Sequence, residues 1–189
     1  MFDKIIARIG ASLDKAEIPY MIIGGQAVLL YGEPRLTRDI DITLGVNIDR
    51  LGTLLALVSA LGFHPLPEDT EGFVRQTMVL PVLDEATGIR VDFIFSFTSY
   101  EQQAIRRAKR LTFLGQEVCF ATAEDLIIHK IFAGRPRDVE DVRGVILKNP
   151  GLDVTYIEQW LREFDALEDE KKLLFTFQQV YAELRKRKS

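Results

Sequence analysis

The hydrophobic period along the chain switches repeatedly between the spacing of a helix and the alternation of a strand. Ile5, Ile6 and Ile9 lie on one helical stripe, which predicts a helix over residues 2–16. Residues 39–44 instead alternate strictly between polar and apolar side chains, which predicts a strand with one polar face. The full pattern predicts helices over 2–16, 26–31, 49–61, 100–109, 136–148, 153–165 and 169–186, and strands over 20–23, 39–44, 73–83, 89–95, 111–114 and 117–120.

This order of elements predicts an α+β fold, a mixed β-sheet flanked by helices with a C-terminal helical region. Residues 84–88 form a turn between two apolar strands, which indicates a hairpin. From Thr122 onward the pattern is helical, and Thr122 is placed to cap the first of these helices ahead of Asp125. We therefore predict an α/β core over 1–120 and a helical region over 121–189 that packs on it.

Composition narrows the class of protein. The chain has 189 residues and a formal net charge of −4, which does not fit a generically basic nucleic-acid binder. Cys119 is the only cysteine and there are two histidines, so an internal disulfide and a Cys/His zinc cluster are excluded. The longest uncharged stretch near the start, residues 20–32, is shorter than the roughly 20 residues that span a membrane. We expect a cytoplasmic protein with no membrane partner.

The candidate chemistry lies first in the strand over residues 39–44. Asp39 and Asp41 are two residues apart, so a strand projects both carboxylates from one face, opposite Ile40 and Ile42. Aspartate is disfavoured in strands, and the like charges repel each other. The pair is stable if the face is solvated, or if a cation such as Mg²⁺ lies between the carboxylates. The pair alone leaves both alternatives open.

Asp92 favours the second alternative, in which a cation lies between the carboxylates. It stands on the polar face of a second predicted strand, opposite Val91 and Phe93. If the two strands are neighbours, three carboxylates meet on one patch, as in sites that hold two divalent ions about 4 Å apart. Adjacency of the strands is an expectation here, since periodicity does not show which strands pair.

Two glycines precede this constellation. Gly24 and Gly25 follow a short apolar strand and open a short helix, a layout that lets the backbone approach a phosphate closely. An ordinary strand–turn–helix connection explains the two glycines equally well.

Taken together, these segments resemble a known signature. Residues 24–32 followed by the Arg-x-Thr-x-Asp-x-Asp motif of 35–41 look like the nucleotidyltransferase superfamily with the DNA polymerase β-like fold. The Gly-Gly form is most similar to the AbiEii-type toxin branch and to related bacterial nucleotidyltransferases. The resemblance covers residues 20–44 and extends to 91–93, 125–130 and 134–142.

The resemblance implies transfer of a nucleoside monophosphate from an NTP to an acceptor, with release of pyrophosphate. It implies that Gly24 and Gly25 cradle the triphosphate. Asp39, Asp41 and Asp92 are then the catalytic carboxylates and the ligands of Mg²⁺ or Mn²⁺.

The resemblance also implies that Arg35, Thr37, Lys130 and Asp138 bind the nucleotide. A solvated lysine is the ordinary alternative for Lys130. The favourable interaction of a carboxylate with a helix start explains Asp138 equally well. The roles of Arg135 and Asp141 stay open.

The acceptor is not encoded in these motifs. The toxin-like resemblance favours RNA or protein, together with a cognate antitoxin as a partner. The first alternative is a small-molecule acceptor of the antibiotic type, which the short chain favours because it has little room for an RNA platform. A non-catalytic protein that binds a nucleotide or a partner on the same fold is the second alternative.

Overall fold

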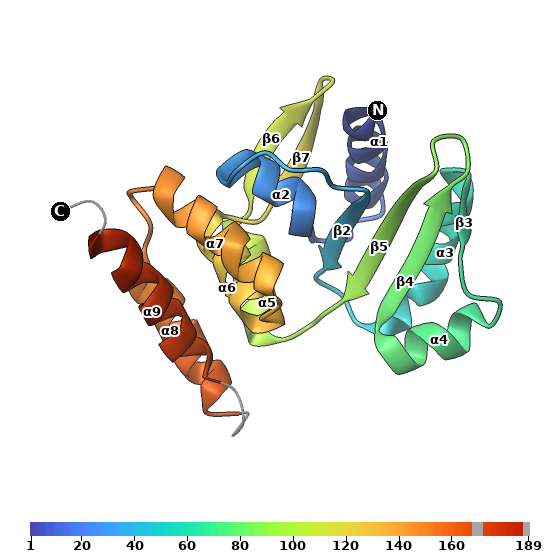
Figure 1. Ribbon diagram of the computed structural model, residues 1–189. Helices are drawn as coiled ribbons and strands as arrows, with labels where there is room; N and C mark the ends of the chain where they lie inside the picture. The colour runs from blue at the N-terminus through green and yellow to red at the C-terminus, as the bar shows by residue number, and fades with distance from the viewer. Residues whose placement is uncertain (168–171, 187–189) are drawn as a thin grey trace. The chain divides into compact units, whose positions relative to one another are not determined.

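The computed structural model describes residues 1–167 and 172–186, and within them seven strands form one mixed sheet (Figure 1). The strands lie in the order β3-β4-β5-β2-β1-β7-β6. The elements are α1 (Phe2–Lys15), β1 (Tyr20–Ile23), α2 (Gly24–Tyr31), β2 (Asp39–Leu44), the 3₁₀ turn η1 (Ile48–Arg50), α3 (Leu51–Ala60), β3 (Phe63–Pro65), α4 (Thr70–Thr77), β4 (Val79–Asp84), β5 (Ile89–Phe95), α5 (Ser99–Arg107), β6 (Lys109–Phe113), β7 (Gln116–Phe120), α6 (Ala123–Ala133), α7 (Pro136–Lys148), α8 (Val154–Asp165) and α9 (Leu173–Lys186).

The centre of the sheet mixes both strand directions. β2 runs antiparallel to β1 on one side and parallel to β5 on the other. β4 and β5 form the antiparallel hairpin expected from the turn between them, and β6 and β7 form a second hairpin. The α+β prediction, a mixed sheet flanked by helices, is confirmed.

Alternation along β2 and β5 separates an apolar face from a polar face. Ile40, Ile42, Val91 and Phe93 are fully buried, while the aspartates between them are only partly buried. Burial of each such apolar side chain contributes on the order of 1.5–3 kcal/mol to folding. The strands therefore keep their polar face outward because the opposite face supplies the core.

The prediction of a strand over residues 73–83 is wrong in its first half. Residues 70–77 form α4, because the Asp69 side chain accepts a hydrogen bond from the Gly72 N–H (3.0 Å) and caps the helix. Met78 adopts a left-handed conformation, φ 58°, and ends the helix, so that β4 begins at Val79. The short strand β3 was not predicted.

The chain divides into two compact units. The first comprises residues 1–26 and 36–121, and the second comprises 27–35 and 122–189. The second unit therefore includes most of α2 and the loop after it, which the sequence pattern assigns to the core.

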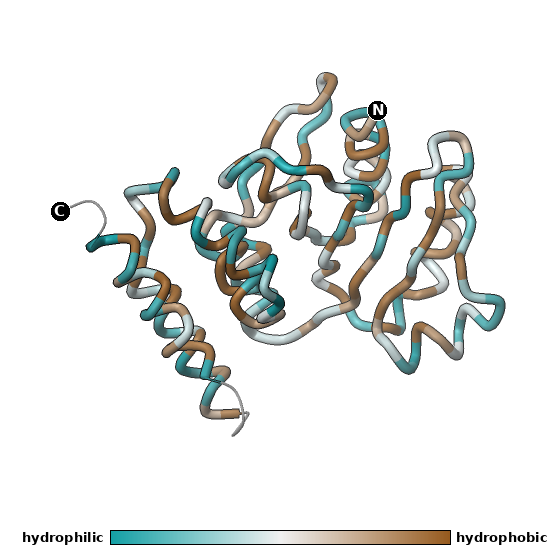
Figure 2. Tube along the Cα trace, in the orientation of Figure 1, coloured by the Kyte–Doolittle hydropathy of each residue, from teal (hydrophilic) through white to brown (hydrophobic). Residues whose placement is uncertain are grey.

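The second unit is a helical assembly built on α6. Thr122 caps α6 as expected, since its hydroxyl oxygen accepts a hydrogen bond from the Asp125 N–H (3.2 Å). α7, α8 and α9 pack together with α6, with Ile127, Ile157 and Phe177 fully buried. Brown and teal alternate along α8 and α9 in Figure 2, the amphipathic pattern of helices with one buried face. The first residues of the helix predicted over 169–186 lie outside the described residues.

No helix among the described residues has both the length and the apolar character that crossing a bilayer requires.

Candidate active site

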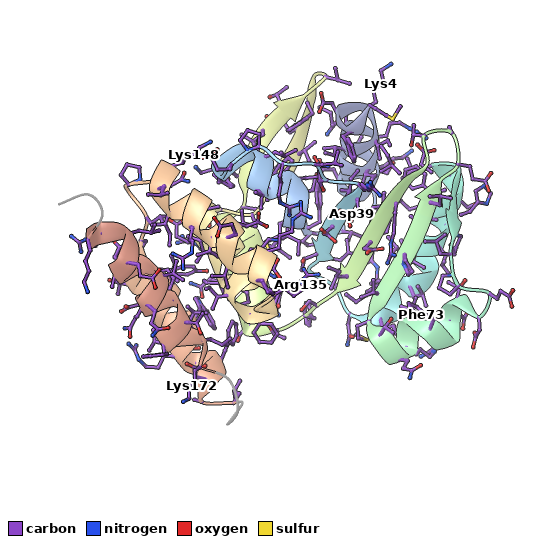
Figure 3. The ribbon with its side chains drawn as sticks, viewed as in Figure 1. Lys4, Asp39, Phe73, Arg135, Lys148 and Lys172 are labelled. Carbon is purple, nitrogen blue, oxygen red and sulfur yellow. The ribbon has the colours of Figure 1, made fainter. Side chains whose placement is uncertain are left out.

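Three carboxylates share one face at the centre of the sheet. The parallel register pairs Asp41 of β2 directly with Asp92 of β5, which confirms the expected adjacency of the two strands. Paired residues on neighbouring strands project to the same face about 4.8 Å apart. Asp39 lies two residues before Asp41 on that face. We call Asp39, Asp41 and Asp92 the carboxylate patch; Asp39 is labelled in Figure 3.

Arg90 neutralises part of this patch, and sequence reasoning missed it. Its Nε donates a hydrogen bond to Asp92 Oδ1 at 2.7 Å, and its register partner on β2 is Asp39. The hydrogen bond to Asp92 raises the pKa of Arg90 by more than partial burial lowers it. The charges of Asp39 and Asp41 raise that pKa further. The signal in the sequence is simple: Arg90 lies two residues before Asp92, hence on the same face.

The patch has the donor chemistry of a divalent-ion site but is not closed around a metal. Among residues 1–167 and 172–186, no three His, Cys, Asp or Glu side chains are gathered as a ready ligand set. The hydrogen bond to Arg90 engages Asp92 Oδ1. Mg²⁺ commonly uses one or two carboxylates and completes its shell with substrate phosphates and water. The carboxylate patch fits that mode of binding.

Gly24 joins the patch through close packing. It adopts φ +63°, and a Cβ built on it would overlap Asp41 Oδ2. Glycine is therefore required at position 24 for two reasons: the backbone is left-handed, and the Asp41 carboxylate fills the space that a Cβ would occupy. α2 begins at Gly24 itself rather than at residue 26, so both glycines belong to its first turn. The N–H groups of that turn have no partner within the helix.

Thr37 and Gln26 hold the start of β2. The Thr37 hydroxyl lies 3.2 Å from Asp39 Oδ1, to which it donates a hydrogen bond, and its side chain is buried. The Gln26 amide donates a longer hydrogen bond to the Asp39 carbonyl, at 3.4 Å. Gln26 was not among the predicted site residues. Both contacts orient Asp39 from the segments that flank β2.

The other predicted nucleotide-binding residues lie in the second unit, in a buried cluster of charges. Lys130 of α6 contacts Asp138 Oδ1 at 2.7 Å and Asp141 Oδ2 at 2.9 Å, both from α7. Arg35 binds Asp141 through two hydrogen bonds, Nε–Oδ1 at 2.9 Å and Nη2–Oδ2 at 3.1 Å. We call these residues, together with Arg135, the α6–α7 ion cluster.

Arg135 completes the ion cluster at the start of α7, where it is labelled in Figure 3. Its Nε donates a hydrogen bond to Asp138 Oδ2 at 2.6 Å. Burial alone would raise the pKa of Asp138, but the hydrogen bonds from Arg135 and Lys130 outweigh it and lower that pKa below its ordinary value. The cluster ties the loop before β2 and helix α6 to helix α7.

Known structures share this architecture. The antibiotic-resistance factor ANT(2'')-Ia aligns with a TM-score of 0.55 at 21% identity, over 98% of this chain and 96% of its own. A second ANT(2'')-Ia structure, in complex with adenylyl-2''-tobramycin, aligns with a TM-score of 0.54 at 20% identity, over 99% and 98%. An antigenic nucleotidyltransferase-like protein from Paracoccidioides brasiliensis aligns with a TM-score of 0.55 at 18% identity, over 92% of each chain. At these identities the likeness establishes the fold.

No curated protein sequence matches the chain. A family model does: the model described as "Nucleotidyltransferase of unknown function" (DUF6036) matches residues 1–188. The match spans both units, the carboxylate patch and the α6–α7 ion cluster. The resemblance to nucleotidyltransferases is thereby confirmed at the level of the superfamily, and the chain belongs to the DUF6036 family of nucleotidyltransferases.

Proposed function

We propose that this nucleotidyltransferase uses the carboxylate patch to move a nucleoside monophosphate from an NTP to an acceptor. The observation that carries the proposal is the register of β2 and β5, which places Asp92 directly beside Asp41 and on the face of Asp39. Like charges at neighbouring strand positions repel one another, and folding alone gives no reason for three aspartates to share this face.

Binding of divalent ions would explain why three aspartates share this face. Asp39, Asp41 and Asp92 would hold Mg²⁺ or Mn²⁺, which offsets the charge of the triphosphate and of the attacking oxygen. Thr37 and Gln26 orient Asp39 for this role, and Gly24 leaves the space that Asp41 occupies. The triphosphate would lie against the first turn of α2 at Gly24 and Gly25, where backbone N–H groups that have no partner within the helix favour an anion.

The bond changes follow from the reaction class. The acceptor hydroxyl loses its proton to solvent as its oxygen attacks the α-phosphorus, the bond from that phosphorus to the bridging oxygen breaks, and pyrophosphate leaves with the bonding electrons. Asp92 would complete the site beside the acceptor. The chain contributes chiefly by positioning the reactants and by stabilising charge.

The predicted nucleotide contacts of Arg35, Lys130 and Asp138 require a change in the α6–α7 ion cluster. The Lys130 ammonium group contacts two carboxylates within 3 Å, and its side chain is only 8% exposed. To bind a phosphate, it would have to break both contacts and move out of this buried position. Separating a buried ion pair costs several kcal/mol. The contacts therefore favour a structural role for these three residues before the nucleotide binds.

For the acceptor, we favour a small molecule that carries a hydroxyl group. The chain and ANT(2'')-Ia, whose complex holds adenylyl-2''-tobramycin, cover nearly the whole of each other. RNA or protein as the acceptor, the first expectation from the toxin-like resemblance, is the second candidate. The cognate antitoxin stays a prediction of that resemblance alone.

Thermal unfolding with each NTP, with and without Mg²⁺, tests the binding step. Ligands that bind only the folded state raise the melting temperature. We expect an increase that requires both NTP and Mg²⁺ and that Asp41→Asn abolishes. Asp49→Asn, an exposed aspartate in η1, is the matched control and should keep the shift.

Incubation with labelled NTPs and separate pools of aminoglycosides, tRNA and protein then tests the transfer step. Label in the aminoglycoside pool supports the favoured acceptor class, and label only in RNA or protein supports the second candidate. Absence of any melting shift with all NTPs would contradict the proposal. Binding without labelling of any pool would favour the non-catalytic alternative.

A further inference from the structure

We propose that Arg90 is a built-in counter-ion of the carboxylate patch, which holds Asp92 in the metal-free protein and competes with the divalent ion for it. This inference rests on the proposed function, because it assigns a positioning role within the same site. It makes Arg90 the residue that keeps three carboxylates stable together until metal and nucleotide arrive.

The register of the sheet places Arg90 among the carboxylates. Asp39 pairs with Arg90 across β2 and β5, and Asp41 pairs with Asp92 in the next position on the same face. Four charged side chains thus occupy the corners of one rectangle, about 4.8 Å across the strands and twice the strand rise along them. Three corners are negative, and Arg90 is the positive one.

The contact geometry shows which carboxylate Arg90 engages. Its Nε lies 2.7 Å from Asp92 Oδ1 in a charge-assisted hydrogen bond. The Asp92 side chain is 17% exposed, whereas that of Arg90 is 51% exposed. The carboxylate is therefore held in place, and the guanidinium group on the open side is free to withdraw into solvent.

Asp92 Oδ1 cannot accept the hydrogen bond from Arg90 and bind a divalent ion with full strength at the same time. A divalent ion needs lone pairs of the Asp92 carboxylate at about 2.0–2.1 Å for Mg²⁺, within a strict octahedral geometry. The hydrogen bond from Arg90 uses one of those lone pairs and places a positive charge where the ion would experience repulsion. Metal binding through Oδ1 therefore requires the guanidinium group to release that oxygen, and its positive charge also disfavours an ion bound through Oδ2.

The alternative, that Arg90 and Asp92 form an ordinary surface ion pair with no influence on metal binding, predicts a different result. If Arg90 and Asp92 formed only such a pair, loss of Arg90 would change the stability slightly and leave metal binding unaltered. Competition predicts that loss of Arg90 destabilises the metal-free protein and tightens metal binding. The two alternatives therefore differ in one measurable quantity: loss of Arg90 lowers the dissociation constant for Mn²⁺ if Arg90 competes with the ion, and leaves it unchanged if it does not.

The experiment measures Mn²⁺ binding by the signal of free Mn²⁺ in electron paramagnetic resonance, without nucleotide or acceptor. For Arg90→Gln we expect a dissociation constant lower by about two- to fivefold, the ratio that corresponds to loss of one exposed competing ion pair. Arg90→Lys keeps the charge and should stay near wild type. Arg110→Gln on β6 removes the same charge from an exposed strand position and is the matched control, expected to bind as wild type.

A double-mutant cycle with Asp92→Asn tests whether the effect passes through Asp92. If it does, Arg90→Gln changes Mn²⁺ binding clearly less in the Asp92→Asn background than in wild type. An equal change in both backgrounds would overturn the proposal, because Arg90 would then act through general charge alone. Circular dichroism of each variant confirms that the comparison is between folded proteins.

The outcomes separate this inference from the proposed function. If wild type binds Mn²⁺ and Asp41→Asn does not, while Arg90→Gln binds no more tightly than wild type, the counter-ion role is wrong and the proposed function stands. If neither wild type nor Arg90→Gln binds Mn²⁺ without nucleotide, the counter-ion role fails, because no metal competes for Asp92 in the free protein, and the melting shift with NTP and Mg²⁺ decides the proposed function separately. Tighter binding by Arg90→Gln, with Arg110→Gln unchanged, supports the counter-ion role.

Discussion

At the scale of single residues, the carboxylate patch depends on what surrounds each aspartate. Gly24 supplies space for Asp41, Thr37 donates to Asp39, and Arg90 donates to Asp92. Thr37 and Arg90 thus stabilise two of the carboxylates in the absence of metal, and Gly24 leaves room for the third. The arrangement is consistent with a site where the electrostatic strain of gathered like charges is offset locally until a ligand binds.

Gly24→Ala tests the space beside Asp41. Alanine at φ +63° costs about 1–2 kcal/mol in backbone energy, and its Cβ would displace the Asp41 carboxylate. We expect a lower urea midpoint and loss of the melting shift with NTP and Mg²⁺. Gly62→Ala is the matched control, since Gly62 has φ +73° but nothing within 4 Å of the added Cβ. It should lose similar stability and keep the shift, and equal loss of the shift in both variants would contradict the assignment.

At the scale of elements, the α6–α7 ion cluster joins segments that are distant in sequence. Arg35 comes from the loop before β2, Lys130 from α6, and Asp138 and Asp141 from α7. The carboxylates are 2–7% exposed, so the ion pairs with the cationic side chains offset the cost of burying each charge. Hydrophobic packing of α6 on α7 sets the position of the helices, and the cluster then fixes their register.

Asp138→Asn tests the cluster through its pH dependence. Because the pKa of Asp138 is lowered on folding, its contribution to stability is present above the unfolded pKa of about 3.9 and is lost as the pH falls through the folded value. We expect Asp138→Asn to lose about 3–5 kcal/mol at pH 7, as when one partner of a buried ion pair is removed. The difference from wild type should shrink below about pH 4.

Urea unfolding at pH 7 and pH 3 measures this difference. Glu140→Gln, on the exposed side of the same helix, is the control and should follow wild type at both values. A difference between wild type and Asp138→Asn that is as large at pH 3 as at pH 7 would show that loss of charge is not the cause.

At the scale of the whole molecule, the chain passes between its two units after residues 26, 35 and 121. The Arg-x-Thr-x-Asp-x-Asp motif therefore straddles a boundary, with Arg35 in the second unit and Asp39 in the first. A motif that is continuous in sequence thus supplies residues to two separate charged clusters.

The single cysteine reports whether folding protects its thiol. Cys119 lies on β7 in the first unit, and burial is the largest cause that raises the pKa of its thiol. Because the thiolate is the reactive form, we expect iodoacetamide at pH 8 to alkylate the folded protein more slowly than the same chain in urea. The rate for the folded protein should increase with pH beyond the range of a free thiol, about 8.5. Equal rates for folded and unfolded protein would contradict a protected thiol.

Local periodicity accounts for much of what could be predicted. The strands over 20–23, 39–44 and 89–95 occur as expected, because alternation between a buried and an exposed face is written into consecutive residues. The prediction fails at α4, where Phe73 and Val74 resemble the start of the apolar stretch of β4, but the Asp69 cap and Met78 at the end select a helix. A three-residue strand such as β3 is too short to show a period.

By itself, the sequence determined that Asp39 and Asp41 share a face and that Asp92 stands opposite its buried neighbours, because side-chain direction in a strand is a local property. Only the tertiary structure decided that β2 and β5 are parallel neighbours in register and that Asp41 fills the space beside Gly24. It also decided that Lys130 binds two buried carboxylates. These contacts join residues far apart in the chain, and strand pairing and helix packing, which no local pattern encodes, bring them together.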